Sequence, residues 1–130
     1  MDKRVSMLTI EEKTRICALV ADSRKANDIL VLDVGPLSSI ADRFLICSGS
    51  SDRQVQAIAD AIREELTKQD EKPLAVEGYD QGTWILIDCA DLILHVFDDE
   101  TREFYDLEHL WHQAAKIEVA GLSPATIAGS

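Results

Sequence analysis

The chain of 130 residues has few basic residues, few cysteines and no long apolar segment, and each scarcity argues against a class of protein. Only 13 Lys and Arg stand against 24 Asp and Glu, which gives a formal charge of −11. Because cations that neutralise phosphates supply most of the affinity for nucleic acids, we expect no direct nucleic-acid binding. No stretch approaches the roughly 18 apolar residues of a membrane span, and the N-terminal residues lack the apolar core of a signal peptide.

The three cysteines are Cys17, Cys47 and Cys89, and no two of them form a C-x-x-C pair. This spacing indicates neither a zinc site nor a dithiol redox motif. Each cysteine lies in an apolar stretch, where a buried and reduced thiol is expected. Reduced thiols favour a cytoplasmic location.

The length and the hydrophobic fraction of 46% predict one globular domain. After Ala120 the composition changes to small, polar, glycine- and proline-containing residues. We therefore expect an N-terminal extension over 1–9, one folded domain over 10–118 and a flexible tail over 119–130.

Two segments have helical spacing of their apolar residues, and a capping-box pattern precedes each. These helices are expected over 10–24 and 52–69. A third helical region follows residue 100. Its broad apolar stripe consists of Phe104, Leu107, Leu110, Trp111 and Ala114.

Segments rich in branched apolar residues predict five strands, at 29–34, 43–48, 74–77, 84–88 and 91–97. The first strand is apolar at nearly every residue, which is typical of a strand buried on both faces. The last two strands are separated by two residues, which predicts an antiparallel hairpin. The order of elements predicts a single α/β domain, with a mixed, mostly five-stranded sheet and flanking helices.

The turn Gly49-Ser50-Ser51 lies between a strand and a helix and could hold a phosphate at the helix N-terminus, as in a nucleotidyltransferase. The nearby acids Asp33, Asp88 and Asp91 do not form a metal-ligating pair at alternate strand positions. A helix cap at Ser51 explains the turn without a ligand. We therefore favour a protein that is not an enzyme and expect no catalytic residue, cofactor or metal.

Five other polar residues could carry chemistry, and each also has a simpler structural explanation. His95 lies inside an apolar strand, where a hydrogen-bonded structural role is favoured over contact with a partner. His109 and His112 are three residues apart, but no third metal ligand is evident. Asp88 and Asp91 flank the hairpin turn, where Asp side chains bind backbone N–H groups more often than they bind a cation or act as an acid/base pair.

The region from Asp91 to Glu108 has seven acidic residues and one basic residue, Arg102, for a local charge of −6. Solvation alone explains such a region, but it also suits a basic protein partner, because complementary potentials speed and orient association. Core packing is the default role of the two tryptophans, Trp84 and Trp111, although Trp84 follows a glycine-rich loop where exposure is plausible. We therefore predict a protein-recognition surface within residues 78–111.

Two long segments of this region resemble the signature of the ribosomal silencing factors, the Iojap family. They are VEGYDQGTWILIDCADLILHVF at 76–97 and REFYDLEHLW at 102–111. The upstream segments ILVLDV at 29–34 and SSIADRFLICSGSSDRQVQAIA at 38–59 are similar too, so the likeness covers most of the chain. The resemblance implies a nucleotidyltransferase-like α/β fold without established transferase activity.

The same resemblance implies a partner and a function. Members bind the large ribosomal subunit through the fourteenth protein of the L series, sterically block joining of the small subunit and repress translation. A role in large-subunit assembly is the alternative, and free members tend to form homodimers. Ala90 is a departure, because many relatives carry glycine there. The partner-binding residues that we expect are Asp80, Trp84, Asp88, Asp91, His95, Tyr105, Leu107, Glu108, Leu110 and Trp111.

Overall fold

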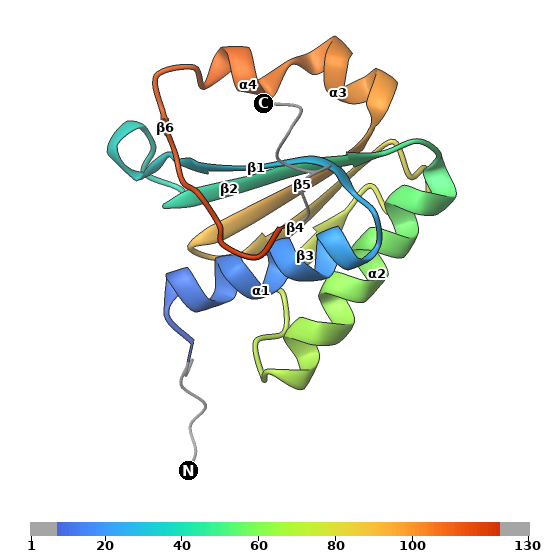
Figure 1. The fold of residues 1–130 in the computed structure, drawn as a ribbon, viewed down its shortest axis with the longest axis horizontal. Helices are drawn as coiled ribbons and strands as arrows, with labels where there is room; N and C mark the ends of the chain where they lie inside the picture. Colours follow the sequence, from blue (N-terminus) through green and yellow to red (C-terminus); the bar gives the residue numbers. More distant parts are fainter. Residues whose placement is uncertain (1–7, 123–130) are drawn as a thin grey trace.

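The computed structural model describes residues 8–122, which form a mixed sheet with helices on both faces (Figure 1). The strands are β1 (Asn27–Asp33), β2 (Arg43–Gly49), β3 (Ala75–Glu77), β4 (Trp84–Cys89), β5 (Leu92–Asp98) and β6 (Ala115–Lys116). The helices are α1 (Ile10–Ser23), α2 (Asp52–Lys68), α3 (Asp99–Tyr105), α4 (Leu107–Leu110) and the 3-10 turn η1 (Gly35–Leu37). The strand order across the sheet is β3-β4-β5-β2-β1-β6.

The sheet is mixed because its two central strands, β2 and β5, are parallel, whereas all other neighbouring pairs are antiparallel. The predicted hairpin of β4 and β5 is confirmed. The prediction of five strands is wrong in number, because β6 adds a sixth strand beside β1. A strand of two residues is too short to produce an alternating pattern in the sequence.

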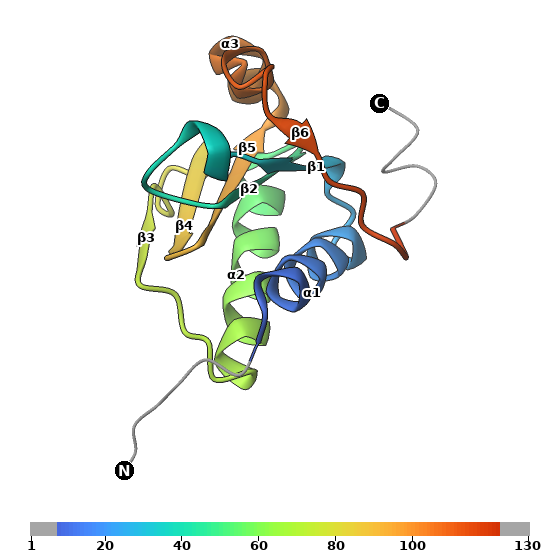
Figure 2. The same cartoon turned by 90° about the vertical axis from the view of Figure 1, so that its left-hand side faces the viewer.

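Helices α1 and α2 cover one face of the sheet, whereas α3 and α4 lie over the other (Figures 1 and 2). The predicted capping box of α1 is confirmed: Thr9 Oγ1 accepts from the Glu12 backbone N–H, and Glu12 Oε1 accepts from the Thr9 N–H. The apolar stripes of both helices pack on strand residues that alternate toward them. This main core includes Cys17, Ala21, Val31, Leu45, Cys47, Ile58, Ile62, Leu66, Ile85, Ile87, Leu94 and Val96.

The opposite face of the sheet carries a second, smaller core. Its buried members are Leu32, Val34, Ala41, Phe44, Ile46, Phe97 and Leu107. Val31 and Leu32 of β1 therefore pack on opposite sides, as predicted for a strand buried on both faces.

The last helical region differs from the prediction of one continuous apolar stripe. Asp106 has a left-handed backbone conformation (φ 50°), which ends α3 and redirects the chain into α4. The break separates the predicted stripe into two parts. Leu107 is buried, whereas Phe104 and Leu110 are 78% and 70% exposed, so the members of the predicted stripe do not share one buried face.

Beyond β6 the chain crosses to the α1 side of the sheet (Figure 1). There Ile117, Val119 and Leu122 pack against the main core, although the last two fall in the region predicted as a tail. The remainder of that tail, 123–130, and most of the predicted extension, 1–7, lie outside the described residues.

All three cysteines are buried free thiols, as predicted. Burial raises the pKa of Cys47 and of Cys89 to about 12 and raises that of Cys17 further. These thiols therefore stay protonated and unreactive at neutral pH. No helix within residues 8–122 has both the length and the apolar character needed to cross a membrane.

Candidate protein-recognition surface

The candidate chemical sites of the sequence have structural explanations. Ser51 Oγ accepts from the Gln54 N–H at 3.1 Å and caps α2, while Gln54 Oε1 accepts from both the backbone N–H and the hydroxyl of Ser50. The side chains of Ser50 and Ser51 are thus engaged by Gln54 of α2. His109 and His112 stack with ring centroids 5.8 Å apart, and no group of three possible metal ligands exists in the described part of the chain.

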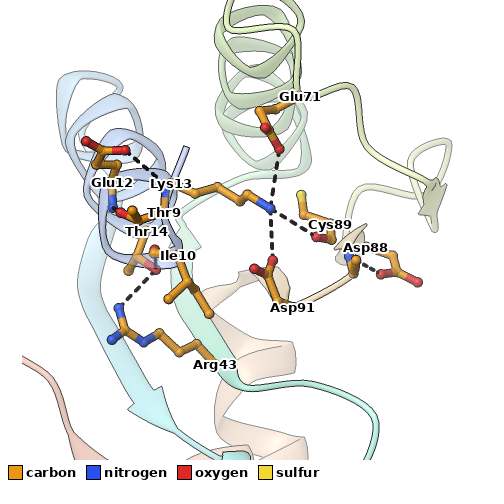
Figure 3. Close-up of polar contacts among 11 residues, drawn as sticks. Thr9, Ile10, Glu12, Lys13, Thr14, Arg43, Glu71, Asp88, Cys89 and Asp91 are labelled. Carbon is orange, nitrogen blue, oxygen red and sulfur yellow. Dashed lines mark hydrogen bonds and ion pairs between the residues drawn. The ribbon is translucent and has the colours of Figure 1, made fainter. Parts of the chain in front are cut away.

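The β4–β5 turn is fixed by a buried lysine (Figure 3). Lys13 Nζ lies 2.9 Å from Asp91 Oδ1, 3.4 Å from Glu71 Oε1 and 3.4 Å from the Cys89 carbonyl oxygen. Burial alone would lower the pKa of Lys13, but Asp91 and Glu71 outweigh it and the pKa is raised. The lysine therefore joins α1, the chain after α2 and the turn as a charged group.

Asp88 and Asp91 both take part in this turn. Asp88 Oδ1 accepts from the Ala90 backbone N–H at 2.9 Å, as predicted for an aspartate that closes a turn. The register of the hairpin places this turn at the opposite end from Trp84. The structure therefore separates the two aspartates from the other expected partner-binding residues, and their contact with a partner stays a prediction.

Trp84, at the other end of the hairpin, is held by aromatic neighbours and one hydrogen bond. Its indole Nε1–H donates to Nδ1 of His95 at 3.1 Å, and its ring lies 4.8 Å from that of Tyr105 and 4.9 Å from that of Phe97. The predicted hydrogen-bonded role of His95 is thereby confirmed. These contacts fix the plane of the half-buried indole before any partner arrives.

His95 is 5% exposed, and burial lowers its pKa to about 4, so the imidazole is neutral at physiological pH. Because Nδ1 accepts the Trp84 proton, the ring proton resides on Nε2. Nε2 is buried, and no group within residues 8–122 forms a hydrogen bond with it. The ring of Phe44 meets the imidazole edge-on with centroids 4.8 Å apart, so the histidine is enclosed by aromatic rings.

The loop before Trp84 is shaped by glycine and tied to α2. Gly78 has φ +81°, and a Cβ atom there would lie 2.1 Å from the carbonyl oxygen of Trp84. Gln56 Nε2 donates to the carbonyl oxygens of Tyr79 at 2.9 Å and Asp80 at 3.4 Å. The exposed Asp80 side chain is therefore displayed on a loop whose backbone is fixed.

Arg102, which we did not predict as a functional residue, ties α3 to the sheet and to α4. Its Nε donates to Glu108 Oε2 at 2.8 Å, and its terminal nitrogens donate to Ser48 Oγ and to the carbonyl oxygens of Asn27 and Asp28. The sequence signal was its position as the single base among seven acids. The charge of Glu108 is compensated within the chain, so this residue contributes less to an external field than the sequence suggests.

Apart from these Arg102 contacts, α3 presents exposed aromatic side chains beside Glu100, and exposed acids on the side that carries Arg102. Phe104 is 78% exposed and Tyr105 is 51% exposed. We call the set formed by Trp84, Phe104, Tyr105 and the exposed acids Asp99, Glu100, Glu103 and Asp106 the aromatic–acidic surface. An exposed apolar patch bordered by charges is typical of a protein interface.

A family model described as "Ribosomal silencing factor during starvation" matches residues 7–129. This chain belongs to the ribosomal silencing factor family. It is 43% identical to the ribosomal silencing factor of Bacillus subtilis over 100 residues, 77% of this chain and 85% of that protein. A crystal structure of a Chromobacterium violaceum protein is similar at a TM-score of 0.79 and 30% identity, covering 93% of this chain and 99% of that one.

A further relative of this silencing factor family member is the mouse "Mitochondrial assembly of ribosomal large subunit protein 1". The two are 34% identical over 89 residues, which are 66% of this chain and 39% of the mouse protein.

In this member of the silencing factor family, the α3–α4 side of the sheet gathers seven of the expected partner-binding residues: Trp84, His95, Tyr105, Leu107, Glu108, Leu110 and Trp111. Of these, His95 and Leu107 are buried and serve as support. Leu110 is 70% exposed on α4. Phe104, the most exposed large apolar side chain among residues 8–122, was not among the expected partner-binding residues, because its spacing placed it on the predicted apolar stripe.

Proposed function

We propose that this chain binds the large ribosomal subunit in the cytoplasm through the fourteenth protein of the L series and blocks joining of the small subunit. Translation is then repressed by steric occlusion, without a covalent step. Family membership supports the ribosomal partner. The observation that carries the proposal is the aromatic–acidic surface, which is displayed on a hairpin and helix fixed by buried contacts.

The charge of this surface selects the class of partner. Of its four acids, Glu100 lines a pocket with the aromatic rings, whereas Asp99, Glu103 and Asp106 line a second pocket with Arg102. Arg102, the single base of the region, is engaged with Glu108 and backbone carbonyls. A basic protein surface would be steered toward it, and aromatic side chains are frequent interface anchors. We place the contact at the Trp84 end of the hairpin, which is the end remote from Asp91.

The test is co-sedimentation of the purified protein with isolated large subunits, followed by addition of small subunits to measure their joining. We expect binding to free large subunits and inhibition of joining. Phe104→Ala should weaken binding by about tenfold, since central aromatic anchors contribute roughly 1–2 kcal/mol or more.

Leu74→Ala is the matched control for this variant. Leu74 is 72% exposed, but its backbone N–H donates to the Asp88 carbonyl oxygen, so it lies at the turn end of the hairpin. It should bind like the unchanged protein. A protein that ignores large subunits, or two variants that bind equally, would contradict the proposal. Glu108 is unsuitable for charge reversal because the change would also break the Arg102 contact.

A role in large-subunit assembly is the second candidate function, and the name of the mouse relative favours it. A strain that lacks the protein should then accumulate immature large subunits during growth. Normal subunit profiles, together with loss of repression in starvation, would favour silencing. The homodimer implied for free members stays a prediction, which sedimentation velocity of the purified protein tests.

A further inference from the structure

A pocket of about 490 Å³ opens between the β3–β4 loop and α3. Its lining residues are Gln81, Thr83, Trp84, Glu100, Thr101, Phe104 and Tyr105. Three of these seven are aromatic, and Glu100 is the only charged one. The pocket therefore combines aromatic faces with one carboxylate, and no cation of the lining neutralises that carboxylate.

The hydrogen bonds around the pocket determine what it offers to a ligand. The indole N–H of Trp84 is already donated to His95, so the indole offers its π face in place of a donor. The ring of Tyr105 lies 4.8 Å from that of Trp84, and the ring of Phe104 stands perpendicular to that of Tyr105 at 5.0 Å. Aromatic faces of this kind attract cations through their quadrupoles.

The surrounding charges favour a cation as well. Asp99 and Glu103 are exposed on the same helix as Glu100, but they line a second pocket together with Arg102. Arg102, between them in the sequence, directs its guanidinium to Glu108, Ser48 and the carbonyls of Asn27 and Asp28. An anion entering the pocket would be repelled, whereas a positively charged side chain would gain both carboxylate and π contacts.

We infer that this pocket receives an arginine side chain of the protein partner. The inference rests on the proposed function and specifies the partner's chemistry at that surface. Guanidinium is planar, so it stacks on an aromatic face while its N–H groups pair with a carboxylate in a bidentate manner. The compact ammonium of lysine cannot make both contacts with the same geometry, and it is more strongly hydrated.

The first test needs no ribosome. Amide and indole resonances of the ¹⁵N-labelled protein are followed while N-acetyl-arginine amide is added to tens of millimolar, with N-acetyl-citrulline amide as the neutral isostere. We expect shifts at the Trp84 indole and at Glu100 to Tyr105 with arginine only. Equal shifts with citrulline or with N-acetyl-leucine amide, or no shifts at all, would overturn the inference.

Glu100→Gln and Glu103→Gln form a matched pair for this titration, because both residues are exposed on α3 but only Glu100 lines the pocket. Glu100→Gln should weaken arginine binding about threefold, because an exposed ion pair contributes only modestly. Glu103→Gln should leave it nearly unchanged. Equal effects of the two variants would refute the role of Glu100.

The affinity of the same two variants for large subunits tests the proposed function and the arginine contact separately. If large subunits bind and Glu100→Gln weakens binding more than Glu103→Gln does, both the proposed function and the pocket contact are supported. If both variants bind large subunits as tightly as the unchanged protein does, the proposed function is supported and the arginine contact is refuted. Arginine binding by a protein that ignores large subunits overturns the proposed function and leaves a cation pocket that serves another partner.

Discussion

Replacing Lys13 by methionine should destabilise the protein strongly, although the residue lies far from the aromatic–acidic surface. Methionine keeps most of the apolar stem and removes the ammonium group. The lysine side chain is 7% exposed and contacts the carboxylates of Glu71 and Asp91, which are 8% and 37% exposed. The substitution therefore removes the cation that compensates two carboxylates, one of them buried.

The expected loss in the free energy of unfolding follows from the burial of Lys13, Glu71 and Asp91. Breaking a buried ion pair by removal of one partner typically costs about 3–5 kcal/mol. Because the Asp91 carboxylate is partly solvated, we expect the lower end, about 3 kcal/mol. A domain of this size has a free energy of unfolding of about 5–15 kcal/mol, so the variant should still fold at low temperature.

Urea unfolding followed by far-ultraviolet circular dichroism measures this loss. With a denaturant slope of roughly 1.5 kcal/mol/M, the midpoint should fall by about 2 M. Lys68→Met, on the exposed last turn of α2, is the control and should change stability by less than about 0.5 kcal/mol. A Lys13→Met variant as stable as the control would refute the buried ion cluster. Its affinity for large subunits, measured well below the melting temperature, should be unchanged.

Three further predictions concern the β4–β5 hairpin and the loop that precedes it. Ala90 has φ +72°, so Ala90→Gly should stabilise the protein by about 1 kcal/mol in urea unfolding, whereas an unchanged midpoint would contradict the strained turn. His95 must be neutral to fold, and its pKa falls from 6.5 to about 4 on folding. The stability that depends on neutral His95 is therefore fully present above pH 6.5 and is lost as the pH falls toward 4. Between pH 7 and pH 5 the free energy of unfolding should fall by about 2 kcal/mol more for the unchanged protein than for His95→Asn. If the free energies of unfolding of the two proteins change in parallel with pH, this linkage is excluded. Gly78→Ala should cost more than about 2 kcal/mol and weaken large-subunit binding, because the new Cβ meets the Trp84 carbonyl; wild-type thermal stability would contradict this.

The sequence predicted most elements correctly because their signals are local. The capping box of α1 spans three residues, and the apolar periodicity of α2 lies within one segment. The errors arise where local signals are weak or ambiguous. Strand β6 has two residues, and a left-handed aspartate at position 106 has no distinctive pattern in an acidic region. That backbone conformation separates Phe104, which is 78% exposed, from the buried Leu107 of the predicted stripe.

The candidate surface could be predicted only as a region, because contacts between residues distant in the sequence arrange it. Asp91 and Glu108 belong to the same acidic run, yet Asp91 pairs with Lys13, 78 residues away, and Glu108 with Arg102. Arg102 itself contacts residues 54 to 75 positions away. Neither periodicity nor composition indicates such pairings. The local charge of −6 therefore overestimated how much Asp91 and Glu108 contribute to the electrostatic field outside the protein.

The contacts of Lys13 and those of Arg102, which we call the two clamps, lie at opposite ends of the sheet. They explain how an acidic chain can present a negative surface on a rigid support. Lys13 and Arg102, whose side chains are 7% and 11% exposed, neutralise carboxylates in or near the interior and hold segments that are distant in sequence. Neither Lys13 nor Arg102 lines the pocket that holds Glu100. Substitution of a clamp cation should therefore change stability, whereas substitution of an exposed acid on α3 should change association with a basic partner. Because the two properties depend on different residues, variants of this chain can separate folding from binding.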